Sequence, residues 1–154
     1  MSPAPSLHQL LHTERQGVLA TLSARRHGWP FASVAPYALS DDSEPLLLLS
    51  DLAEHTRNLR ADPRASLLVQ DSSMLDEPQA GARVTLLGSV GALSSDQAPE
   101  ARVRYIDQHP EAAQYLALGD FRLYVLHILE ARFVNGFGDM GWLAADRLRA
   151  QLAG

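Results

Sequence analysis

The apolar residues of this chain follow two different periods. Leu7, Leu10 and Leu11 are at helical spacing, which predicts a short amphipathic helix that ends before Gly17. Six later segments are rich in apolar and β-branched residues and are bounded by turn residues, which is typical of strands. The predicted strands are Val18–Ser23, Phe31–Ala38, Leu46–Ser50, Ala65–Gln70, Ala82–Leu93 and Phe121–Val134.

Helical spacing returns between these strands and at the end of the chain. A short helix at Ala53–Ala61 is stopped by Asp62 and Pro63. Ser94 or Ser95 can cap a later helix, and Pro110 can open another. The helices expected after that point are Ala98–Gln108, a short one from Pro110 to Leu118, and a closing amphipathic helix at Leu143–Leu152.

This order of elements predicts one domain over residues 1–154, mainly β with flanking helices. Hairpins dominate and no strand–helix–strand alternation is sustained, so the sheet is expected to be mostly antiparallel. Six strands at short spacing favour a barrel, because closure removes the exposed sheet edges. No internal repeat or linker divides the chain.

Composition and charge exclude several classes of function. The chain is 46% hydrophobic and 20% charged, with a formal net charge of −5. This balance argues against sequence-blind binding to nucleic acid and against binding to an anionic membrane surface. The absence of cysteine excludes disulfides, thiolate metal sites and cysteine nucleophiles. With no signal-like N-terminus and no apolar run longer than Leu46–Leu49, a cytoplasmic location is the default expectation.

Five segments, in order, carry a resemblance to a known family. They are Gly17–Leu22, Gly28–Tyr37, Leu48–Pro63, Ala82–Gly88 and Ala131–Gly138. The chain resembles the pyridoxamine 5′-phosphate oxidase-like flavoproteins with the FMN-binding split-barrel fold, and is most similar to the branch of haem-utilisation proteins. The resemblance implies a six-stranded antiparallel split β-barrel that forms a homodimer. It further implies FMN at the dimer interface and redox chemistry on a small-molecule substrate stacked on the flavin.

The turn from the third strand into the Ala53–Ala61 helix is the strongest candidate site. A helix N-terminus offers unpaired backbone N–H groups and a positive dipole end, which suits a phosphate. Ser50 and Thr56 can add hydroxyl donors, and His55 or Arg57 can add charge. The alternative is an ordinary helix start with a solvated polar face.

By the resemblance, the oxidases themselves carry a lysine on the phosphate where this chain has His55, and a glutamine where it has Asn58. Their C-terminal arginine-containing substrate motif has no match here. These differences argue against oxidation of pyridoxamine phosphate specifically. No residue stands out as a catalytic acid or base.

Two further positions are candidates for the cofactor. Ser33 is a small residue on a strand, where a flat ring can approach the backbone, although the strand is equally an ordinary barrel wall. Arg83 has the planar guanidinium that suits phosphate, but an ion pair with a nearby acidic residue is an equal alternative. The predicted cofactor-binding residues are Ser33, Val34, Ser50, His55, Thr56, Arg57, Asn58 and Arg83.

The remaining features are interpreted structurally. His8 and His12 lack a third ligand and are expected on an exposed polar face, so no metal site is predicted. His109 is expected to cap a helix, and His127 is expected to be a core or interface histidine. The glycine-rich segment 135–138 is expected to be a strand-to-helix turn.

Two other functions stay open. In one, the domain binds haem and degrades it or passes it on, as the haem-utilisation branch implies. In the other, it has lost any cofactor and acts as a structural or regulatory dimer. A visible spectrum separates these alternatives, because flavin and haem absorb at different wavelengths and a protein without a cofactor does not absorb visible light.

Overall fold

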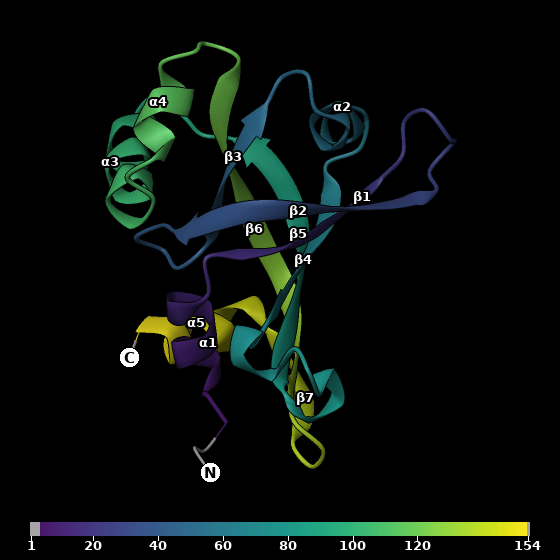
Figure 1. The fold of residues 1–154 in the computed structure, drawn as a ribbon. Coiled ribbons are helices and arrows are strands. Elements are labelled where there is room, and N and C mark those ends of the chain that lie inside the picture. The colour runs from purple at the N-terminus through teal and green to yellow at the C-terminus, as the bar shows by residue number, and fades with distance from the viewer. Residues whose placement is uncertain (1–3, 154) are drawn as a thin grey trace.

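The fold, given by a computed structural model that describes residues 4–153, is a closed barrel of antiparallel strands with helices at its two ends (Figure 1). The strand order is β3-β2-β1-β4-β5-β6-β7, and an additional pairing of β3 with β6 closes six strands into a ring. The strands are β1 (Gln16–Leu22), β2 (Pro30–Leu39), β3 (Pro45–Ser50), β4 (Arg64–Gln70), β5 (Ala82–Ala92), β6 (Phe121–Asn135) and β7 (Met140–Ala144).

The helices cover the openings and one flank of the barrel. The helices are α1 (Leu7–Thr13), α2 (Glu54–Ala61), α3 (Ala98–Gln108), α4 (Ala112–Leu116) and α5 (Ala145–Ala153). In Figure 1, α1 and α5 lie together at the lower left and α3 and α4 lie together at the upper left, while α2 lies beside the β1–β2 hairpin. Among the described residues, no helix is both apolar and long enough to cross a bilayer.

Burial of apolar side chains explains why these elements pack as they do. A first cluster fills the barrel interior and is covered by Leu7, Leu10 and Leu11 of α1 and by Leu148 and Leu152 of α5. A second cluster lies between β2, β3 and β6 on one side and α3 and α4 on the other. The strand β3 contributes to both clusters, which is why five consecutive residues of it are buried.

The mainly β fold class and the antiparallel six-stranded barrel are confirmed. The strand β7 was missed, because the closing helix was predicted to begin at Leu143 and in fact begins at Ala145. Gly136 has a φ of 75°, which helps the chain reverse and lay β7 antiparallel against β6. The same pairing makes segment 135–138 a strand-to-strand turn rather than the predicted strand-to-helix turn.

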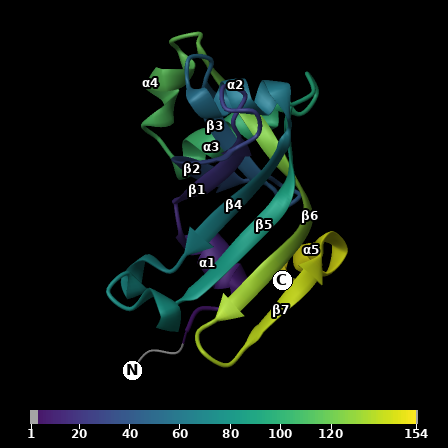
Figure 2. The same ribbon diagram turned by 90° about the vertical axis from the view of Figure 1, so that its right-hand side faces the viewer.

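The pairing of β5 with β6 contains a bulge between Leu87 and Gly88. A Cβ atom at Gly88 would overlap the backbone carbonyl of His127, so only glycine fits at this close approach. Figure 2 shows β4, β5 and β6 running side by side past this region. The bulge locally changes which side chains of β6 face outwards, and Leu129 is left 71% exposed.

Two buried tyrosines link helices to the barrel. The Tyr37 hydroxyl donates to the Leu11 carbonyl at 2.7 Å, and Tyr105 packs on the second cluster beside His109. Burial raises the pKa of both hydroxyls above the usual value near 10.

Stability is therefore expected to fall as the pH rises above about 10. In that range the unfolded chain releases the tyrosine protons while the folded protein keeps them, so deprotonation favours unfolding. The urea midpoint measured between pH 8 and 11 should decrease, and the decrease should be smaller in the Tyr37→Phe/Tyr105→Phe variant. An equal pH dependence in both proteins would contradict this cause.

Candidate functional site

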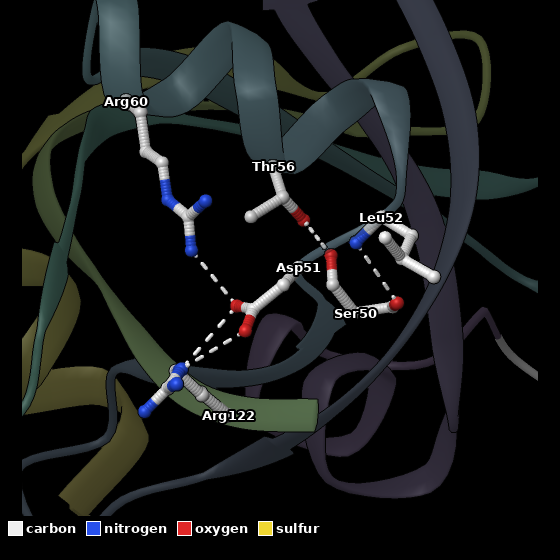
Figure 3. A network of polar contacts seen from close by, with 6 residues as sticks. All are labelled: Ser50, Asp51, Leu52, Thr56, Arg60 and Arg122. Carbon is white, nitrogen blue, oxygen red and sulfur yellow. Dashed lines mark hydrogen bonds and ion pairs between the residues drawn. The ribbon is translucent and has the colours of Figure 1, made fainter. Parts of the chain in front are cut away.

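The turn between β3 and α2 is held by its own hydroxyl groups (Figure 3). The Thr56 hydroxyl donates to the Ser50 carbonyl at 2.6 Å, and Thr56 is only 1% exposed. The Ser50 hydroxyl oxygen accepts the Leu52 backbone N–H at 3.1 Å. The structure therefore brings the two predicted residues Ser50 and Thr56 together, and both hydroxyls are engaged within the turn.

A carboxylate that sequence reasoning missed occupies the same corner. Asp51 accepts hydrogen bonds from Arg60 of α2 at 2.8 Å and from Arg122 of β6 at 3.3 Å (Figure 3). Arg122 reaches Asp51 because β3 pairs with β6, which places Arg122 opposite Leu49. No sequence signal links positions so far apart, so only the barrel closure reveals this network.

Two more predicted residues have structural partners. The exposed Arg57 pairs with Glu54 at 3.4 Å, one turn away on α2. Asn58 is 1% exposed; its Nδ2 donates to the Thr21 hydroxyl at 3.0 Å and its Oδ1 accepts the Ala24 backbone N–H at 3.0 Å. Asn58 thus ties the β1–β2 hairpin to α2.

His55 and Ser33 form the second part of the corner. The His55 Nδ1 and the Ser33 hydroxyl oxygen are 2.9 Å apart, which joins α2 to β2. Burial lowers the pKa of His55 from its usual value near 6.5, so the imidazole is neutral at pH 7. In the described part of the chain, the Nε2 of His55 has no hydrogen-bond partner. A neutral imidazole with one nitrogen anchored and the other open is suited to binding a metal centre.

Large apolar side chains are exposed on the segments that carry Ser33 and His55 and on the hairpin turn before them. Phe31 lies on the same face of β2 as Ser33 and is 36% exposed. Leu52 opens the turn into α2, and Trp29 ends the turn of the β1–β2 hairpin; each is 72% exposed. The elements that form the corner therefore carry a neutral imidazole and exposed apolar side chains.

The last two predicted residues do not join the corner within one chain. Val34 points to the outer face of β2, opposite to Ser33, and is 63% exposed. Arg83 pairs in register with Gln70, at the end of β4 far from α2. Its Nη1 donates to the carbonyls of Pro78, Gln79 and Gly81, which replaces the ion pair offered as an alternative.

The other histidines stack on each other, end a helix or contact a carboxylate. His8 and His12 stack on one face of α1, and the described residues contain no group of three side chains that could hold a metal ion. His109 ends α3, as predicted, and its Nε2 is 2.6 Å from the Tyr37 carbonyl oxygen. His127 is not a core residue, because its side chain is 55% exposed and contacts the buried Glu44. Its alternative place at an interface stays a prediction.

Comparisons with known proteins give a consistent result. Residues 3–148 match the family described as CREG, beta-barrel. The chain is 32% identical over 136 residues to the chloroplastic non-canonical heme oxygenase HOZ of Arabidopsis thaliana, covering 88% of this chain and 41% of that protein. It is 27% identical over 150 residues to the heme oxygenase HutZ of Vibrio cholerae, covering 94% and 82%.

Solved structures agree with these relatives. A heme binding protein from Mycobacterium smegmatis is 35% identical, with a TM-score of 0.84, and the match covers 97% of this chain and 62% of that one. A protein of the pyridoxinephosphate oxidase family from Clostridium acetobutylicum is 13% identical, with a TM-score of 0.67, covering 90% and 92%. The second likeness shows the split-barrel fold alone. The chain spans less than two thirds of the Arabidopsis and mycobacterial proteins.

Proposed function

Because this chain belongs to the CREG beta-barrel family, with relatives named for haem, we propose that it is a haem-binding protein of the haem-utilisation type. Two of those relatives are named heme oxygenases and one a heme binding protein. All three names refer to haem, and binding is the step that either activity requires. Degradation of haem is a further step, and the test below includes it as a separate measurement.

The observation that carries the proposal is the protonation state of His55 together with its contact to Ser33. Its burial favours the neutral imidazole, and the Ser33 hydroxyl fixes the ring through Nδ1 at 2.9 Å. Such an anchor orients a histidine so that Nε2 can bind iron. The exposed Phe31, Leu52 and Trp29 offer apolar area for a porphyrin face. Bound haem would supply redox or oxygen chemistry, while His55 would bind the iron and the exposed apolar side chains would contact the porphyrin.

The same corner suits FMN phosphate less well. Asp51 already engages Arg60 and Arg122, and Glu54 engages Arg57 at the start of α2. The two carboxylates thus already pair with the three arginines of this corner, so much of the positive charge that a phosphate dianion needs is taken up. These contacts support haem over the FMN that the family resemblance implies.

FMN stays a second candidate for one reason. The residue that caps α2, Ala53, has no side-chain hydrogen bond to the helix start, so backbone N–H groups there are available to an anion. In that alternative the protein is an FMN-dependent oxidoreductase acting on a small molecule.

Titration of the purified protein with haemin and, separately, with FMN decides between these readings. We expect a shifted Soret band that saturates with haemin, and a thermal midpoint that rises with haemin more than with FMN. Flavin absorbance that co-purifies and a midpoint raised only by FMN would overturn the haem proposal. A colourless protein whose midpoint neither ligand raises would support the cofactor-less alternative. Adding a reductant to the haem complex then tests for degradation, as loss of the Soret band.

We also propose that the chain forms a homodimer through the outer face of the sheet. Val34 on β2 and Leu129 at the β6 bulge are large apolar side chains that are 63% and 71% exposed on the barrel exterior. Exposed apolar area of this kind is typical of an interface. Arg83, distant from the corner within one chain, could contact a ligand there only across such an interface.

Replacing Val34 by lysine is expected to shift the protein from dimer to monomer. The charge would have to be desolvated at the interface, whereas it costs nothing on an exposed monomer surface. Light scattering coupled to gel filtration at micromolar concentration measures the mass. Lysine at Val103, a residue of α3 that is 69% exposed, is the matched control and should leave the dimer intact. A Val34→Lys protein that remains dimeric would place the interface elsewhere.

A further inference from the structure

Two adjoining hollows lie on either side of Tyr124 of β6, and neither is lined by His55. The larger one, of about 560 Å³, lies between the ends of β5 and β6 and the helices α3 and α4. The smaller one, of about 320 Å³, lies between α2 and the same two strands. Tyr124 and Ala92 line both, so the two hollows form one groove, which we name the Tyr124 groove.

The walls of the larger hollow are mostly apolar. The side chains come from the end of β5, from α3 and α4, and from β6. They include Leu93, Pro99, Leu116, Phe121 and Leu123. Because Phe121 and Leu123 pack against the second apolar cluster, the wall is part of the packed structure. An apolar molecule can therefore bury surface in a preformed site.

Cationic groups line the groove as well. Arg102 and Arg122 line the larger hollow and Arg60 lines the smaller one. Within residues 4–153, Asp51 is the single carboxylate paired with any of the three. Tyr124 and the Asp51 carboxylate raise the pKa of Arg60 further above its usual value. The groove is thus locally positive by about two charges, in a chain whose formal net charge is −5.

Much of this donor capacity is unused. Arg122 uses only its Nε toward Asp51, so its two terminal nitrogens remain open to another acceptor. Arg102 makes no hydrogen bond or ion pair with any described residue. Two guanidinium groups at the edge of an apolar hollow are the arrangement that a carboxylate recognises, because each can donate two parallel hydrogen bonds.

We propose that the Tyr124 groove binds an organic carboxylate with an apolar body, its chain or ring in the larger hollow and its carboxylate on Arg102 and Arg122. A neutral apolar molecule would leave both guanidinium groups unpaired. A small inorganic anion would leave the apolar wall exposed. The inference does not rest on haem binding, since neither His55 nor Ser33 lines the groove.

Calorimetric titration with octanoate and with its neutral amide, octanamide, tests the charge requirement. Octanoate is expected to bind at least about tenfold more tightly, because charge-assisted hydrogen bonds are lost with the amide. Arg102→Gln should reduce octanoate affinity about tenfold and leave octanamide affinity unchanged. Arg147→Gln, which removes an exposed arginine of α5, is the control with the same change of net charge. Equal affinity for acid and amide, or equal losses in the two variants, would overturn the proposal.

A second variant tests the place of binding. Ala92→Trp should fill the groove where its two hollows meet and abolish octanoate binding. Ala92 is an exposed residue at the end of β5, so the unliganded thermal midpoint should change little. His55→Ala should leave octanoate affinity unchanged, whatever its effect on haem. Binding that survives Ala92→Trp, or that His55→Ala abolishes, would show that the carboxylate binds elsewhere.

Discussion

Replacing His55 by alanine is expected to weaken haem binding by on the order of a hundredfold, or about 2.8 kcal/mol. The variant removes a half-buried histidine whose pKa is lowered by burial and whose ring is anchored to the barrel by the Ser33 hydroxyl. Loss of an axial imidazole should also move the Soret band, because the iron would take water or a weaker ligand. Absorbance titration with haemin measures both effects.

Two matched variants make this result specific. Ser33→Ala keeps the imidazole but removes its anchor, so we expect about a tenfold loss of affinity with the ligand type unchanged. His127→Ala removes a histidine that is also oriented through its Nδ1, by Glu44, but lies on β6 away from the corner. It should bind haemin as the unmodified protein does. If His127→Ala loses the Soret band while His55→Ala keeps it, His55 is not the ligand.

Replacing Asn58 by alanine is expected to lower the free energy of unfolding by roughly 2 to 4 kcal/mol. The side chain makes two hydrogen bonds at a position that is 1% exposed. Without it, the Thr21 hydroxyl and the Ala24 backbone N–H lose partners, and buried polar groups without partners are costly. Urea denaturation followed by circular dichroism gives the change.

The chain supplies an asparagine control for this measurement. The side-chain oxygen of Asn135 is buried and has no hydrogen-bond partner in the described structure, so Asn135→Ala removes no such bond. It should cost less than about 1 kcal/mol. Similar losses in the two variants would mean that Asn58 does not act through its hydrogen bonds.

The strands of the barrel were predictable because each is a run of apolar and β-branched residues bounded by turn residues. Leu46–Leu49 is continuously apolar since it packs against two clusters, and Pro63 ends the α2 region as expected. The strand β7 carried a weaker signal, since only five residues alternate in burial and helical spacing begins immediately after them. Local pattern therefore located the barrel strands but misplaced the last element.

The candidate site was predictable only in part, because its contacts join distant segments. The pairing of Ser33 with His55 follows from the approach of α2 to β2, and Asp51 meets Arg122 through closure between β3 and β6. Sequence placed Thr56 and Asn58 near a ligand on the basis of residue type and resemblance. The structure gives both residues structural hydrogen bonds, a role that residue type alone does not reveal.

The most direct test of the central claim uses His55→Gly with added imidazole. Removing the side chain opens the position beside Ser33, so free imidazole can enter and bind the haem iron in its place. We predict that haemin bound to His55→Gly has an altered Soret band, and that imidazole restores the spectrum of the unmodified protein. A variant whose haem spectrum and affinity already equal those of the unmodified protein, without imidazole, would contradict the assignment of His55 as the haem ligand.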